Sequence, residues 1–174
     1  MRTQLFAALA FSSLFSLRAP AQTRAQLVSD WERQRANVLA YLDAMPDSAM
    51  GYRPTPGVRD FAQQIEHFVT TNLEVATRAL RGATAPPFAL DTTQMHQKAV
   101  LRDYTARVYD YLLESLRTAT PTQLMKQTAM YNQVPQSTSR LLFLAYEHAA
   151  WTMGQTVPYL RLNGVTPPAY RQPF

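Results

Sequence analysis

Four stretches of this chain carry apolar residues at helical spacing, and proline-bearing connections separate them. The spacing predicts helices over residues 23–45, 58–80 and 93–116, and a fourth that begins at Ser137 or Thr138 and ends at Asn163 and Gly164. No run of alternating apolar residues is bounded by turn signals, so a sheet is not expected. Four amphipathic helices of about 20 residues each predict an all-α protein that folds as an antiparallel four-helix bundle.

Prolines, glycines and capping residues mark the ends of these helices. Pro46 ends the first helix, and Gly82 is expected to cap the second. Asp91 is placed to cap the third, with Gln94 positioned for a reciprocal bond. Residues 118–136 are expected to hold one or two helical turns. The second helix has one apolar stripe, formed by Phe61, Ile65, Phe68, Asn72 and Ala76.

The first 21 residues, MRTQLFAALAFSSLFSLRAPA, have the pattern of a cleavable signal peptide. Arg2 provides the positive start, residues 5–17 the apolar run, and residues 19–21 (Ala-Pro-Ala) the cleavage site. A run of this length is too short to span a bilayer, which needs about 20 residues. The alternative, a buried N-terminal helix, is disfavoured because an arginine and a proline end the run abruptly. We therefore expect a mature domain over residues 22–174, exported to the periplasm or the extracellular space.

Composition narrows the classes of partner. The chain has no cysteine, so it offers neither a lipid-attachment site nor a disulfide framework. It carries 17 Lys and Arg against 12 Asp and Glu, and loss of Arg2 and Arg18 with the signal lowers the net charge from +5 to +3. The basic residues are scattered, so no nucleic acid partner is expected. Stable membrane insertion is not expected either. The tail over 165–174 is expected to fold back over its own bundle, and a homodimer built on it is the alternative.

His148 lies on the inward face of the fourth helix, together with Leu141, Thr152 and Gln155. An inward imidazole needs a partner for each nitrogen, because an unsatisfied buried polar group costs about 1–3 kcal/mol. Spacing alone favours a hydrogen-bonded core histidine over a metal ligand at this position.

His67 lies on a polar stripe of the second helix, with Gln64, Thr71 and Glu74. Spacing alone favours a solvated face, but such a stripe can also line a groove towards a neighbouring helix, where ligand sites form in bundles. His96 is expected at the surface. Two histidines on different helices are too few to declare a metal site. The chain also lacks the H-E-x-x-H and G-x-S-x-G motifs and a phosphate-cradling glycine loop.

Two segments resemble the DinB-like superfamily of metal-dependent four-helix-bundle proteins, which includes bacterial thiol S-transferases and mycothiol-dependent maleylpyruvate isomerase. Residues 41–68, YLDAMPDSAMGYRPTPGVRDFAQQIEHF, resemble the end of the family's first helix, its Arg-Pro-rich link and its second helix with a histidine. Residues 147–168, EHAAWTMGQTVPYLRLNGVTPP, resemble a segment usually written H-E-x-H-H-R-G-Q, followed by Y-L-R-x-x-G and two prolines. The likeness runs in order over essentially all of residues 22–174.

The resemblance implies a metal site of three histidines, one on the second helix and two, four residues apart, on the last. The first falls on His67, the second on His148 and the third on Thr152. Trp151 stands where the family often has a further histidine, while Gln155 agrees with the family. A threonine hydroxyl is a poor ligand for zinc or nickel beside imidazole, so the ligand set is incomplete.

Two functions follow from this departure. The first is an exported DinB-like bundle with a degraded metal site, which binds a small molecule or a partner without catalysis and needs no cofactor. Its pocket would be lined by His67, His148, Trp151, Thr152 and Gln155. The second is a zinc- or nickel-dependent transferase or hydrolase that uses the two histidines, with Glu66, Glu74, Glu147 or water completing the site. A metal would there lower the pKa of a bound thiol or water. The sequence favours the first function and leaves open whether the protein is an enzyme.

Overall fold

The computed structural model describes residues 22–131 and 133–172, so the expected signal peptide lies outside the described residues. The long helices are α1 (Arg24–Ala44), α2 (Phe61–Val75), α3 (Lys98–Thr118) and α5 (Thr138–Leu162). The short elements are α4 (Pro121–Met125), 3-10 turns at Asp47–Ala49 and Thr92–Gln94, a π-helical turn at Ala76–Leu80, and the two-residue strands β1 (Gln127–Thr128) and β2 (Gln136–Ser137). A mostly helical fold is thus confirmed, with one small antiparallel strand pair that was not expected. No helix in this part of the chain is both long enough and apolar enough to cross a membrane.

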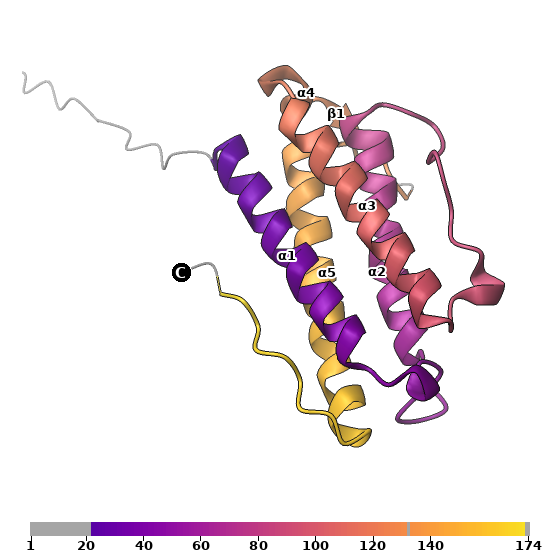
Figure 1. Cartoon of the computed structure of the whole chain (residues 1–174). Helices are drawn as coiled ribbons and strands as arrows, with labels where there is room; N and C mark the ends of the chain where they lie inside the picture. Colours follow the sequence, from indigo (N-terminus) through magenta and orange to yellow (C-terminus); the bar gives the residue numbers. More distant parts are fainter. Residues whose placement is uncertain (1–21, 132, 173–174) are drawn as a thin grey trace, which may run out of the picture.

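The four long helices pack side by side, with α1 against α3, and α2 against both α3 and α5 (Figure 1). α1 and α5 run in one direction, and α2 and α3 run in the other (Figure 1). Neighbours are therefore antiparallel in the α1–α3 and α2–α5 pairs, as predicted, but parallel in the α2–α3 pair. The connection over 81–97 allows this exception. An extended chain covers about 3.3–3.6 Å per residue, whereas a helix rises only about 1.5 Å per residue, so this connection can return along the whole bundle.

Side-chain caps decide where the helices begin. α1 begins and ends within one residue of the prediction. α2 begins at Phe61, three residues later than predicted, because the Asp60 carboxylate accepts a hydrogen bond from the backbone N–H of Gln63 (2.9 Å). α3 begins at Lys98, because Asp91 caps the separate 3-10 turn over Thr92–Gln94 instead of α3 itself.

All four long helices contribute to the core. The predicted apolar stripe of α2 is completely buried. Trp31 of α1 and Tyr109 of α3 are the largest fully buried side chains, with ring centroids 6.2 Å apart. The Tyr109 hydroxyl donates to Oε1 of Gln34 (3.0 Å) and accepts from Nδ2 of Asn72 (3.2 Å). The polar groups of this region are therefore bonded to one another across three helices.

The carboxyl-terminal tail folds back over its own bundle, as favoured from the sequence (Figure 1). The side chain of Asn37 on α1 accepts a hydrogen bond from the backbone N–H of Arg171 (2.9 Å) and donates one to its carbonyl (3.4 Å). Because Asn37 is buried, the tail supplies partners that its amide would otherwise lack.

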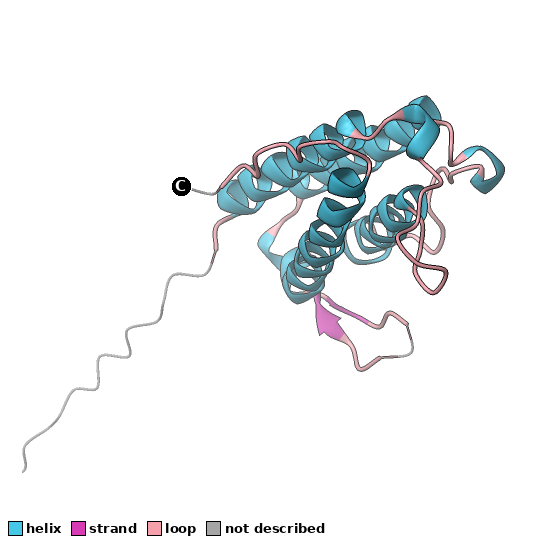
Figure 2. Ribbon diagram, turned by 90° about the horizontal axis from the view of Figure 1, so that it is seen from below, coloured by secondary structure: helices cyan, strands magenta, loops and turns pink. Residues whose placement is uncertain are grey.

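The end of α2 is joined to the start of α5 by a hydrogen bond. The π-helical turn continues α2, and its Ala79 carbonyl accepts a bond from the hydroxyl of Thr138, the first residue of α5 (3.1 Å). The Thr138 N–H donates to the carbonyl of Lys126 (2.9 Å), which ties the strand pair to the same place. β1, β2 and the loop between them project from this end of the bundle (Figure 2).

Candidate ligand site between α2, α5 and the β1–β2 connection

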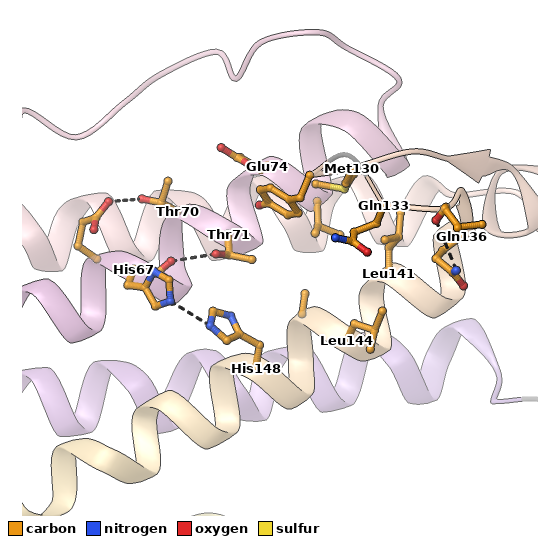
Figure 3. Close-up of a pocket in the computed structure, with 15 residues that line it drawn as sticks. His67, Thr70, Thr71, Glu74, Met130, Gln133, Gln136, Leu141, Leu144 and His148 are labelled. Carbon is orange, nitrogen blue, oxygen red and sulfur yellow. Dashed lines mark hydrogen bonds between the residues drawn. The ribbon is translucent and has the colours of Figure 1, made fainter. Parts of the chain in front are cut away.

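His67 of α2 and His148 of α5 face each other across the seam between their helices (Figure 3). Their Nε2 atoms are 3.1 Å apart, and the ring planes are nearly perpendicular, at 89°. Both residues are half-buried. Of the two interpretations of the polar stripe on α2, the structure therefore supports a groove towards a neighbouring helix at His67.

Both imidazoles are held in the neutral form. Burial, reinforced by the positive charge of Arg59, lowers the pKa of His67 and of His148 from the usual value of histidine. Two neutral rings at this distance fit one N–H···N hydrogen bond, whose donor depends on the tautomer. The Nδ1 atom of His148 is buried and has no hydrogen-bond partner among the described residues. This histidine therefore satisfies only one of its two nitrogens.

A hollow of about 560 Å³ extends from the histidine pair towards the amino-terminal end of α5. Its walls come from α2, from α5 and from residues 130–131, 133–134 and 136 (Figure 3). Apolar side chains make up much of the lining: Val75, Met130, Val134, Leu141, Leu144 and Ala145. Small-molecule pockets span about 300–1,000 Å³ and are mostly apolar with a few polar groups, so this hollow has the size and lining of one.

Acidic and hydroxyl groups supply the polar part of the lining. Glu66 and Glu74 both contribute from α2, and Oε1 of Glu66 accepts a hydrogen bond from the Thr70 hydroxyl (2.8 Å). Tyr131 also lines the hollow and lies next to Glu74, and burial together with that carboxylate raises the pKa of its phenol. Its backbone φ is 52°, a left-handed conformation that non-glycine residues seldom adopt. Residues in such conformations cluster at ligand sites, which agrees with the place of Tyr131 on the hollow.

Trp151, Thr152 and Gln155 were predicted to surround the histidines, but none of them lines this hollow. The hollow extends from His148 towards Leu141, whereas these three residues follow His148 on α5. Trp151 is 73% exposed, and Thr152 is buried. Oε1 of Gln155 lies 3.4 Å from Nε2 of Gln64, in a polar layer beyond the histidine pair.

The donor set does not fit the metal site that the resemblance implies. At metal–nitrogen bonds of about 2.0–2.1 Å, two nitrogens of a tetrahedral site lie about 3.4 Å apart, so the 3.1 Å spacing alone is compatible with a shared ion. A catalytic zinc, however, takes about three protein ligands. Within residues 22–131 and 133–172, no group of three or more His, Cys, Asp or Glu is placed to hold a metal ion. Glu66, Glu74 and Glu147 therefore do not complete the set.

Sequence reasoning missed the third wall of the hollow. Met130, Tyr131 and Val134 belong to a segment without helical periodicity, and only the exposed apolar character of Tyr131 and Val134 marks it in the structure.

His96 is exposed, as predicted, but its Nε2 also lies 3.1 Å from Oδ2 of the buried Asp60.

Comparison with known proteins agrees with this architecture. The family described as the DinB superfamily matches residues 30–169. The chain belongs to this superfamily. Its structure is similar to that of a DinB-like protein from Bacillus subtilis, with a TM-score of 0.69, 19% identity, and coverage of 84% of this chain and 99% of that one. It is also similar to a DinB-like protein from Bacillus cereus, with a TM-score of 0.70, 18% identity, and coverage of 86% and 99%. At these identities the likeness establishes the DinB-like fold. No curated protein matches the chain.

Proposed function

We propose that this protein is an exported DinB-superfamily bundle that binds a small, largely apolar molecule without catalysing a reaction on it. The observation that carries the proposal is the hollow of about 560 Å³ beside the His67–His148 pair. An apolar surface of this kind is costly to leave in water, and covering it with a ligand is favourable by about 25 cal/mol per Å².

The incomplete ligand set supports a binding role over a catalytic one. Thr152 stands at the third position of the family's histidine set, and a hydroxyl is a poor substitute for imidazole.

Binding of an uncharged fluorescent probe tests the proposal. N-phenyl-1-naphthylamine should bind with a saturable increase in fluorescence and one site per chain. Leu144→Trp places a bulky ring in the hollow and should weaken the probe's affinity at least tenfold. Phe143→Trp is the matched control, because Phe143 is the adjacent residue of α5, is exposed, and does not line the hollow. If both variants bind like the parent protein, the probe does not enter this hollow and the proposal fails.

The second candidate is a divalent-metal-dependent transferase or hydrolase that uses His67 and His148. The 3.1 Å spacing of the two Nε2 atoms favours it, because two nitrogens that share one ion lie about this far apart. Metal analysis of protein purified without chelators separates the two candidates. Zinc or nickel near one equivalent, lost in His148→Ala, would replace the binding proposal with this one.

Export is the part of the proposal that depends on residues 1–21. Their charge and apolar run are those of a signal peptide. A reporter enzyme that is active only outside the cytoplasm, fused after residue 30, should be active, and Leu5→Arg together with Leu14→Arg should abolish that activity. Full activity of the double variant would contradict export by this segment.

A further inference from the structure

Two acidic side chains in the hollow stand apart from the other acidic residues of the chain. Of the 12 Asp and Glu residues, eight form ion pairs with Arg, Lys or His. Asp91 instead accepts hydrogen bonds from Thr93 and Gln94. Glu66, Glu74 and Glu147 have no cationic partner within 4.0 Å among the described residues, and the first two both line the hollow.

The lining of the hollow contains no Lys or Arg. Arg59 acts on the histidine end and Arg78 acts on Tyr131, but neither lines the hollow. The two carboxylate residues that line the hollow therefore have no Lys or Arg beside them in its lining, although the overall net charge of the protein is positive.

We infer that the ligand of this hollow is a lipophilic organic cation, an ammonium group on an apolar body. The body would cover Leu141, Leu144 and Val134, and the ammonium would lie against a Glu66 or Glu74 carboxylate. Tyr131 also lines the hollow, and an aromatic ring against the same charge stabilises bound ammonium groups. This inference depends on the proposed binding function and adds to it the charge of the ligand.

The two carboxylates are too far apart to bind the same ammonium group. They are eight residues apart on α2, which corresponds to about 12 Å along the helix axis. One ammonium group therefore engages one carboxylate at a time, while the apolar body occupies the space along α5. Oε1 of Glu66 already accepts the Thr70 hydroxyl, and the Thr70 hydroxyl is also 2.9 Å from the Tyr104 hydroxyl, so this carboxylate is held in place before the ligand binds.

The test compares three probes with the same chain and different charge: octylammonium, octan-1-ol and octanoate, measured by isothermal titration calorimetry at pH 7.5. Octylammonium should bind at least tenfold more tightly than octan-1-ol, a difference of about 1.4 kcal/mol, and octanoate should bind most weakly. Glu66→Gln and Glu74→Gln should together reduce the affinity for octylammonium to that for octan-1-ol. Glutamine keeps an oxygen acceptor for Thr70, so the fold should be retained, and a thermal melt checks this.

Glu147→Gln is the matched control, because Glu147 also has no cationic partner among the described residues but is exposed and outside the hollow. It should leave the preference for octylammonium unchanged. Equal affinities for octylammonium and octan-1-ol would overturn the inferred charge while leaving the binding function intact. Tighter binding of octanoate would overturn it in the same way. Failure of all three probes and of N-phenyl-1-naphthylamine would overturn the binding function itself.

Discussion

The two antiparallel seams of the bundle are constructed differently. The α1–α3 seam is filled with Trp31 and Tyr109, and three ion pairs cross it: Arg35 with Asp110, Arg102 with Asp43, and Arg117 with Glu32. In the described residues, no ion pair crosses the α2–α5 seam. It contains the hollow, the hydrogen bond between the two histidines, and a polar layer in which the Gln64 side chain makes long hydrogen bonds to an amide and to a hydroxyl group.

This difference separates stability from binding within one small fold. A seam whose apolar groups are packed and whose charged groups form ion pairs contributes to the free energy of unfolding. A seam with unpaired carboxylates and an apolar hollow contributes less, because those groups have fewer partners within the protein. We therefore expect substitutions in the first seam to affect folding and substitutions in the second to affect ligands.

The largest expected effect is that of Trp31→Ala in the α1–α3 seam. Trp31 is 1% exposed, and its loss leaves a cavity between Tyr109 and Tyr146. Removal of a buried aromatic ring of this size costs about 3–5 kcal/mol, which chemical denaturation would measure. Leu144→Ala in the hollow is the comparison, and we expect less than about 1 kcal/mol because its side chain already faces open space. Similar losses for the two variants would contradict the division between the seams.

A second prediction restores the third nitrogen of the family's metal site. Thr152→His places an imidazole one helical turn beyond His148. At a zinc concentration about 100-fold above the dissociation constant, binding should stabilise this variant by about 2.7 kcal/mol, seen as a rise in Tm. The parent protein should show no such rise, and His67→Ala in the Thr152→His background should abolish it. Equal stabilisation of the parent protein by zinc would show that two histidines are sufficient.

The pH dependence of stability should report the α2–α5 seam. Burial lowers the pKa of His67 and His148 in the folded state, while the unfolded chain has the ordinary histidine pKa of about 6.5. Below about pH 6.5 the unfolded state therefore binds more protons than the folded state, and stability decreases as the pH falls. Thermal melts between pH 7.5 and 5.5 should show this decrease, and His67→Gln combined with His148→Gln should reduce it. His96→Gln should not, since His96 lies outside this seam. An unchanged slope in the double variant would contradict the buried, neutral state of the pair.

The smallest effect is expected from a single surface ion pair of the α1–α3 seam. The Asp110 side chain is 62% exposed, and its carboxylate lies 3.0 Å from Nε of Arg35. Exposed pairs contribute about 0–1 kcal/mol, so Asp110→Asn should shift the unfolding midpoint only slightly, and less at high salt. A loss as large as that of Trp31→Ala would show that charge contributes as much as packing to this seam.

The sequence predicted the helices well because their ends are set locally. Proline, glycine and capping side chains act within a few residues, and α1 and α5 begin and end close to the predicted positions. The late start of α3 was missed because the Asp91 cap has the same local signature whether a 3-10 turn or a long helix follows. The parallel α2–α3 pair was missed because a long connection is compatible with either direction.

The candidate site was only partly predictable. Helical spacing placed His148 inward but could not show that His67 would lie opposite it, and only the resemblance to DinB-like proteins paired the two. Spacing also could not tell on which side of His148 the hollow would extend, so residues 151–155 were included and Leu144 was not. The wall contributed by Tyr131 and Val134 depends on contacts between distant parts of the chain, which no local pattern encodes.

The hydrogen bond between Thr138 and Ala79 determines how a ligand can enter the hollow. It fastens the two helical walls together beside the π-helical turn, while the histidine bond and the layer around Gln64 join the same walls further along. Because the two helical walls are held at both ends, only the loop that carries Tyr131 is left to move when the hollow widens. The left-handed backbone angle of Tyr131 is costly, so movement of this loop could relieve that cost. Entry of a ligand would thus depend on a few loop residues, while the two helices would stay fixed.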